Sequence, residues 1–139
     1  IVDYYCGVGT IGLALKKEKQ IVELVESNTE AADYAKKNIA LNNFDNCAAI
    51  CQPAEKITEL ITADKIIIFD PPRAGLDKKI IDRVWETEPE TIIYLSCNLS
   101  THARDLSLLL PKYKIEFLKL YNFFPRTAHI EGLAVLKKI

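Results

Sequence analysis

Three side chains in this sequence have types that suit covalent catalysis, and each lies in a short polar motif. Cys97 lies in "SCN", directly after the apolar run 92–95. Asp70 opens "DPPRAG" after another apolar run, and Glu131 closes "HIE" near the C-terminus. A cysteine thiolate can act as a nucleophile, and a partly desolvated glutamate can act as a general base. The sequence therefore offers a candidate nucleophile and a candidate base.

The surroundings of Cys97 bear on its reactivity, because a helix N-terminus or a nearby cation favours the thiolate. A helix is predicted to start just after Cys97, with Ser100 or Thr101 as its N-cap. His102 and Arg104 on that helix could add positive charge. The alternative is that the cysteine is a small buried hydrophobic residue.

Asp70 is followed by two prolines, which donate no backbone N–H and stiffen the turn. A rigid loop beside a cleft positions a polar group at low entropic cost, and Arg73 could contact a phosphate or a carboxylate. The alternatives are a turn-capping role for Asp70 and a solvated loop position for Glu131.

A glycine-rich turn near the N-terminus favours a bound nucleotide-like ligand. Asp3 lies in a predicted strand, Gly7 and Gly9 lie in the following turn, and Glu26 ends the next strand, where a carboxylate can accept both ribose hydroxyls. Gly7, Gly9 and Gly12 also nearly fit the dinucleotide pattern. However, the carboxylate of Asp3 suits a cationic or zwitterionic ligand better than a pyrophosphate. A glycine turn without any ligand is the third possibility.

These residues must be positioned by alternating strands and helices. The apolar runs predict strands at 1–5, 20–26, 47–51, 65–70, 91–96, 114–124 and 132–139. Helical patterns lie at 7–17, 28–43, 53–61, 77–86 and 99–110. Continuous apolar strands that alternate with helices predict a doubly wound α/β fold with a mostly parallel sheet. The last two strands have too short a connection for a crossover helix, so we expect them to pair antiparallel at one edge.

In such folds, ligands bind beyond the carboxyl ends of the strands. The residues at those ends are 5–7, Glu26, Asp70 and Cys97. We therefore expect four strand ends to converge on one cleft.

Composition and charge limit the classes of function. The 139 residues predict one domain, and the net charge of −1 argues against tight nucleic-acid binding by this chain alone. No apolar run is long enough to span a bilayer, so we expect a cytoplasmic protein without membrane contact. We also expect a monomer. The four cysteines form no C-x-x-C pair, which argues against a disulfide framework or a metal site. The chain opens inside a strand pattern and lacks methionine, so we expect a fragment whose upstream segment is absent.

Four motifs in order, "DYYCGVGTIGL", "DPPRAG", "SCN" and "FPRTAHIE", resemble the RNA 5-methyluridine (uracil-C5) methyltransferases. The resemblance spans the whole chain and corresponds to the family's C-terminal catalytic domain. It implies a class I S-adenosylmethionine-dependent methyltransferase fold, Rossmann-like, with a seven-stranded, mostly parallel sheet and an antiparallel edge strand. It also implies methyl transfer to C5 of a uridine in ribosomal or transfer RNA.

The same resemblance implies roles for individual residues. Cys97 would attack uracil C6, Glu131 would remove the C5 proton, and Asp70 would contact the uracil edge and line the cofactor pocket. The residues implied to bind S-adenosylmethionine are Asp3, Tyr5, Gly7, Gly9, Thr10, Glu26 and Asp70. Those implied to contact the RNA are Arg73, Asn98, Arg126 and His129. No metal is implied.

The sequence departs from the family pattern in three places. Leu99 replaces a proline that usually follows "SCN", and Pro53 cannot supply a side-chain contact to adenine, so backbone or Glu55 must substitute. The family's upstream part, with a glutamine-bearing cofactor stretch, commonly an RNA-binding domain and sometimes an iron–sulfur cluster, is not in this sequence. Two other functions stay open: an amino-group methyltransferase with a related "[DN]PP" motif, and a cofactor-binding domain that is inactive as an isolated fragment.

Overall fold

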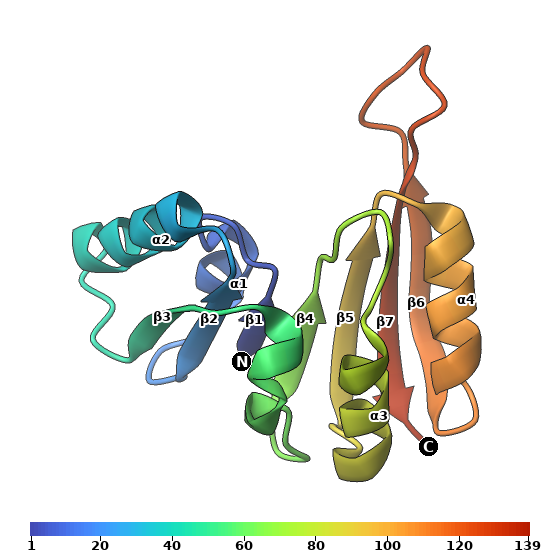
Figure 1. The fold of residues 1–139 in the computed structure, drawn as a ribbon, viewed down its shortest axis with the longest axis horizontal. Helices are drawn as coiled ribbons and strands as arrows, with labels where there is room; N and C mark the ends of the chain where they lie inside the picture. Colours follow the sequence, from blue (N-terminus) through green and yellow to red (C-terminus); the bar gives the residue numbers. More distant parts are fainter.

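The computed structural model describes residues 1–139 as one seven-stranded sheet with helices packed against it (Figure 1). The strand order is β3-β2-β1-β4-β5-β7-β6. The strands are β1 (Val2–Tyr4), β2 (Val22–Glu26), β3 (Cys47–Cys51), β4 (Ile66–Phe69), β5 (Thr91–Ser96), β6 (Tyr113–Tyr121) and β7 (Glu131–Lys138). The helices are α1 (Thr10–Leu15), α2 (Thr29–Leu41), α3 (Lys78–Thr87) and α4 (Leu99–Leu109).

The topology confirms the predicted doubly wound, mostly parallel sheet. Strands β1 to β5 are all parallel, and the strand order reverses between β1 and β4. Because crossovers between parallel strands are right-handed, helices before and after this reversal cover opposite faces of the sheet. Strand β7 pairs antiparallel with both β5 and β6, so the predicted antiparallel edge is also confirmed.

Two apolar cores of unequal size hold the helices on the sheet. The larger comprises 18 buried residues and lies between the central strands and helices α3 and α4. The smaller comprises Val22, Leu24 and Ala35 and lies under α1 and α2. The edge strand β6 is largely exposed along its length. No helix in the structure has the length and apolar character that crossing a bilayer requires.

The prediction of a helix at 53–61 is wrong. This segment forms two single 3₁₀ turns, Ala54–Lys56 and Thr58–Leu60, separated by Ile57 at φ −132°. Ala54 and Ile61 are buried in the larger core, and the β-branched residues of the segment favour helix only weakly. Core packing therefore decides the conformation here.

The N-cap predicted for α4 is also wrong. Asn98, not Ser100 or Thr101, caps the helix, and its side-chain oxygen accepts a hydrogen bond from Ser100 N at 3.1 Å. An asparagine is as good a cap as serine, so the cap lies two residues before Ser100 and the helix begins at Leu99.

Candidate active site at the carboxyl ends of the strands

The register of the sheet brings the polar strand ends to one edge. Tyr4 in β1 pairs with Phe69 in β4, and Phe69 pairs with Tyr94 in β5. The next residues along β1 and β4 are Tyr5 and Asp70, and Asp70 N donates a hydrogen bond to Tyr4 O at 3.4 Å. The residues that follow these strands therefore lie side by side at one edge of the sheet (Figure 1).

The antiparallel strand β7 brings Glu131 to the same edge as Cys97. Ser96 pairs with Gly132 as the last step of the ladder, and Cys97 and Glu131 are the residues next to this pair. Glu131 also raises the pKa of Asp70, although loss of water around the Asp70 carboxyl raises that pKa more. The three candidate catalytic residues thus lie at the same edge of the adjacent strands β4, β5 and β7, although they are as far as 61 positions apart in the sequence.

Neither of the two predicted cations supplies charge to Cys97. His102 is 2 % exposed and packs edge-on against Tyr94, and burial lowers the pKa of its imidazole, which therefore stays neutral near pH 7. Arg104 pairs with the Asp105 carboxylate at 2.7 Å. Cys97 is half-buried and lies directly before Asn98, the N-cap of α4.

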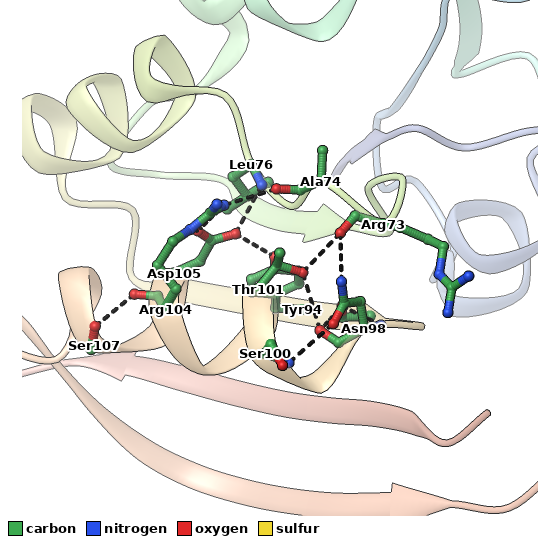
Figure 2. A network of polar contacts seen from close by, with 11 residues as sticks. Arg73, Ala74, Leu76, Tyr94, Asn98, Ser100, Thr101, Arg104, Asp105 and Ser107 are labelled. Carbon is green, nitrogen blue, oxygen red and sulfur yellow. Dashed lines mark hydrogen bonds and ion pairs between the residues drawn. The ribbon is translucent and has the colours of Figure 1, made fainter. Parts of the chain in front are cut away.

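The loop after Asp70 is tied to helix α4 by side-chain hydrogen bonds (Figure 2). Asn98 Nδ2 and Thr101 Oγ1 both donate to Arg73 O, at 2.9 and 3.1 Å, and Arg104 donates to Ala74 O at 2.9 Å. The guanidinium of Arg73 extends away from α4 while its carbonyl faces the helix. Asn98 uses both ends of its amide within the protein, and its predicted contact with RNA stays a prediction.

Asp105 is the centre of this network, and sequence reasoning missed it. Its carboxylate is 1 % exposed and accepts hydrogen bonds from Leu76 N at 2.8 Å, from Tyr94 Oη at 2.7 Å and from Arg104. Burial and then the Asp105 carboxylate raise the pKa of Tyr94. The available signal was an aspartate on the helix face that also carries the buried Leu106 and Leu109. An acid at such a position must have partners.

At the other half of the edge, Glu26 holds the glycine turn. Its two carboxylate oxygens accept from Gly7 N at 2.9 Å and from Asn28 N at 2.8 Å. Gly7 has φ +55°, and a Cβ there would meet nothing within 4 Å, so this glycine faces open space. Gly9 has φ +85°, but a Cβ there would lie 2.7 Å from Leu24, so its small size serves packing against β2.

Asp3 in β1 holds the start of α1, the helix that follows the glycine turn. Its side chain is fully buried, and Oδ2 accepts from Gly12 N at 2.8 Å while Oδ1 has no partner. Burial raises the pKa of this carboxyl to about 7, the bond from Gly12 N opposes the shift, and the negative charge of Asp70 adds to it. The unpartnered oxygen suits a cationic donor such as an ammonium group. A direct contact between Asp3 and a ligand stays a prediction.

The other two predicted cofactor residues border the turn. Tyr5 directly follows β1 and has φ +61°, a conformation that is uncommon for a residue with a side chain. Burial raises the pKa of Tyr5 to about 12, so its phenol stays protonated. Thr10 is exposed at the first position of α1. An open glycine, a strand-end carboxylate and an unpartnered buried oxygen together fit a ligand with a ribose and an ammonium group.

The hairpin loop 122–130 brings two of the predicted RNA-binding residues together. A nitrogen of the Arg73 guanidinium lies 3.5 Å from His129 Nδ1. Arg126 is exposed at φ +71° and has no hydrogen bond or ion pair to either of them. The structure therefore joins Arg73 to this loop and leaves Arg126 apart.

A cavity of about 900 Å³ lies between α3, α4 and the first 3₁₀ turn. Tyr5 and Pro72 line it, but Glu26, Cys97 and Glu131 do not. This cavity is therefore distinct from the row of candidate catalytic groups.

Comparisons with known proteins agree with this geometry. The family model described as tRNA (Uracil-5-)-methyltransferase matches residues 1–139. The chain is 39 % identical to an uncharacterized RNA methyltransferase of Enterococcus faecalis over 143 residues, which cover 99 % of this chain and 31 % of that protein. A relative in Mycoplasma mobile, also named an uncharacterized RNA methyltransferase, is 39 % identical over 100 % of this chain and 39 % of its own length. The chain thus spans about a third of the length of these relatives.

A solved structure of high similarity is the Pyrococcus abyssi tRNA (uracil-54, C5)-methyltransferase in complex with S-adenosyl-L-homocysteine. It superposes with a TM-score of 0.82 at 34 % identity, over 97 % of this chain and 33 % of that one. A precorrin-6y C5,15-methyltransferase from Geobacter metallireducens gives a TM-score of 0.76 at 14 % identity, over 99 % of this chain and 78 % of that one, and shows only the shared fold. With its four motifs on one edge of a methyltransferase-like sheet and a family match along all its residues, the chain belongs to the tRNA (uracil-5-)-methyltransferase family.

Proposed function

We propose that this protein transfers a methyl group from S-adenosylmethionine to C5 of a uridine in transfer or ribosomal RNA, through a covalent adduct between Cys97 and uracil C6. The observation that supports the proposal is the register of β5 and β7, in which Ser96 pairs with Gly132, the residues next to Cys97 and Glu131. A nucleophile and a base must reach adjacent carbons of one pyrimidine ring, and neighbouring strands provide that spacing.

The cofactor is S-adenosylmethionine, as predicted. The Pyrococcus abyssi enzyme and a Mycoplasma capricolum methyltransferase of the same fold were both solved with S-adenosylhomocysteine. In this chain Glu26 would take the ribose hydroxyls, the backbone around Gly7 and Thr10 would face the cofactor, and Asp3 and Tyr5 would support the methionine end. When bound, S-adenosylmethionine supplies an electrophilic methyl group on its sulfonium.

The chain's own residues account for the remaining chemistry. The thiolate of Cys97 forms a bond to uracil C6, and the electrons of the C5–C6 double bond move into an enolate that makes C5 nucleophilic. After C5 has received the methyl group, Glu131 accepts the C5 proton. The electrons of the C5–H bond restore the double bond, the C6–S bond breaks, and Cys97 leaves as a thiolate. Asp70 contacts the uracil edge and holds its orientation.

The substrate uridine must be unpaired, or flipped out of a duplex, for Cys97 to reach C6. The net charge of −1 provides little general attraction for RNA, so we infer that affinity for the substrate needs residues outside this chain. We also propose that the protein is a monomer and acts in the cytoplasm.

An amino-group methyltransferase is the second candidate, because such enzymes use a related motif at the end of the same strand. They need no nucleophilic cysteine and no base on an adjacent strand, so the Cys97–Glu131 pair counts against this reading. A domain that binds cofactor without turnover is the third.

The experiment uses the full-length protein, S-adenosylmethionine and transcribed tRNA and rRNA fragments that contain 5-fluorouridine. Fluorine at C5 cannot leave as a proton, so the enzyme should stall while covalently attached to the RNA. We expect an adduct that survives denaturing electrophoresis and is lost in Cys97→Ala. Cys51→Ala, on a half-buried cysteine of β3, is the matched control and should keep the adduct.

Methyl transfer to ordinary RNA without any adduct would overturn the Cys97 mechanism and favour the amino-group reading. Cofactor binding without methyl transfer or adduct, on every RNA tested, would favour the binding domain.

A further inference from the structure

The hairpin between β6 and β7 carries aromatic side chains that the proposed chemistry does not use. Its loop, residues 122–130, projects beyond the edge of the sheet (Figure 1). Phe123 is 65 % exposed and Phe124 is 52 % exposed. Two phenylalanines that leave most of their surface in water at the tip of a loop indicate a contact surface.

Phe123 is already part of an aromatic stack. Its ring lies parallel to that of Tyr121, with centroids 5.4 Å apart and an interplanar angle of 8°. The ammonium of Lys119 lies 4.9 Å from the Tyr121 ring centroid. Tyr121 is half-buried, so Phe123 is the exposed member of the stack.

The register of β6 places this stack beside the candidate catalytic row. Tyr121 pairs with Glu131 on one side of β7, and on the other side the neighbouring Gly132 pairs with Ser96, the residue before Cys97. Directly paired residues on antiparallel strands project from the same face of a sheet. The side chain of Tyr121 therefore neighbours that of Glu131, and Phe123 continues outward from it.

The charge of the hairpin suits a phosphodiester backbone. Residues 117–130 contain no aspartate or glutamate, in a chain whose net charge is −1. They contain Lys119, Arg126 and His129, and His129 contacts Arg73. Exposed aromatic rings among cations are the features that bind single-stranded nucleic acid, because every base has a π face that can stack.

We propose that the Tyr121–Phe123 stack is a platform for an unpaired RNA base next to the target uridine. The base stacks on the exposed ring of Phe123 while Lys119 and Arg126 meet the neighbouring phosphates. This inference rests on the proposed function, because it assumes that the nucleobase that reaches Glu131 is the reacting uracil.

The test compares Phe123→Leu with Phe123→Trp in the full-length protein. Leucine keeps an apolar side chain but removes the flat ring, and tryptophan keeps a stacking surface. Phe117→Leu is the matched control, because Phe117 is a 42 % exposed aromatic residue within β6, where it pairs with Val135 away from the loop. The measurements are the melting temperature, kcat and KM for an unmodified tRNA transcript, and the fluorescence of a 12-nucleotide oligouridylate with one 2-aminopurine.

We expect Phe123→Leu to raise the KM for RNA by about 5- to 100-fold with kcat within about twofold of the wild type. The 2-aminopurine emission should be quenched by the wild type and by Phe123→Trp, and much less by Phe123→Leu. Phe117→Leu should match the wild type in every measurement.

An unchanged KM and unchanged quenching in Phe123→Leu would overturn the platform. A lower melting temperature without any change in KM would also overturn it, because Phe123 would then be covered by another part of the protein. Failure of the wild type to form the 5-fluorouridine adduct would count against the proposed function instead, since quenching reports stacking without any reaction.

Discussion

The two halves of the sheet hold their functional residues by different means. We call β1–β3 with α1 and α2 the glycine-turn half, and β4–β7 with α3 and α4 the cysteine half. In the glycine-turn half, the Glu26 carboxylate accepts a hydrogen bond from Gly7 N in the turn, and the Asp3 carboxylate accepts one from Gly12 N in α1. In the cysteine half, side chains of one helix hold the loop that follows Asp70 (Figure 2).

This difference matches the role that we propose for each half. A cofactor that is largely the same in every methyltransferase can be met by backbone groups and open glycines, with little side-chain detail. Chemistry at two carbons of one ring needs polar groups fixed relative to one another, and a rigid support improves that positioning. The larger core, with 18 buried residues against three in the smaller cluster, lies mostly under the cysteine half and reaches Val2, Tyr4 and Val25 of the other half.

The largest expected effect comes from Glu131→Gln, which tests the chemistry of the cysteine half alone. Without the base, methylated RNA cannot eliminate from Cys97, so we expect turnover to fall by about 10²- to 10⁴-fold. A denaturation-resistant adduct should now accumulate on ordinary, unsubstituted RNA, while cofactor affinity stays at the wild-type value. Glu116→Gln, on exposed β6, is the control. Release of methylated RNA at the wild-type rate would contradict the assignment.

The next effect is expected from Asp105→Asn, which loosens the support of the cysteine half. An amide cannot accept from Leu76 N, Tyr94 and Arg104 as the carboxylate does, so we expect a loss of about 2–4 kcal/mol of unfolding free energy. We also expect kcat to fall more than cofactor affinity. Denaturant unfolding and cofactor titration check both. Ser107→Ala, on the same helix, is the control and should leave the unfolding free energy, kcat and cofactor affinity unchanged. A loss of cofactor affinity in Asp105→Asn as large as the loss of kcat would contradict the difference between the two halves.

Asp3→Asn tests the glycine-turn half through pH. The folded-state pKa of Asp3, about 7, lies above the usual aspartate value of 3.8, so between about pH 4 and 7 the folded chain keeps a proton that the unfolded chain releases. The Asp3 carboxyl therefore costs stability as pH rises through this window. The variant keeps an acceptor for Gly12 N, so we expect it to match the wild type near pH 4 and to be more stable by about 2–4 kcal/mol at pH 8.

Denaturant unfolding across this pH range checks the expectation, and Asp33→Asn is the control on exposed α2. A constant difference between Asp3→Asn and wild type at all pH values would show that Asp3 does not titrate there. Weaker cofactor binding by the more stable variant would support the predicted contact between Asp3 and the cofactor.

The smallest effect is expected at Glu88, at the end of α3 and away from both sets of functional residues. Hydrogen bonds from Lys112 and Lys138 lower the pKa of Glu88 to about 2. This contribution is present above about pH 5 and disappears as pH falls towards 2. Glu88→Gln should lower the melting temperature at pH 7 by about 1–3 °C, less so in 1 M salt, without changing kcat or cofactor affinity. A change in either would show that the far end of the sheet affects the site.

Sequence patterns predicted much of the fold, because strands buried on both faces produce continuous apolar runs. The run Ile66–Phe69 and the run 92–95 both became parallel strands, and the polar residue after each lies at the carboxyl edge. Segments whose conformation depends on contacts elsewhere were missed. The 3₁₀ turns around Ile57 follow from core packing. The N-cap of α4 was missed because Asn98, Ser100 and Thr101 are all residues that can cap a helix, and the local sequence does not distinguish them.

Candidate site residues could be found where a motif ends a strand, and not where they act through a partner distant in the sequence. Cys97 and Asp70 follow apolar runs, but Asp105 contacts Leu76 across 29 positions, and nothing local reveals that bond. The Tyr121–Phe123 stack was likewise read only as part of a strand. Its meaning depends on the register of β6 with β7, which a single sequence does not specify.

The antiparallel placement of β7 has a consequence for how specificity can change. Residues 122–130 leave and re-enter the sheet on two neighbouring, hydrogen-bonded strands, whose pairing has one register shift, between Ile115 and Phe117. An exchange confined to the loop leaves the pairing of Tyr121 with Glu131 in place, whereas a one-residue slip of β7 would turn Glu131 to the opposite face. On the proposed function, an exchange of the loop between relatives should therefore change which RNA is bound while the proposed reaction stays the same.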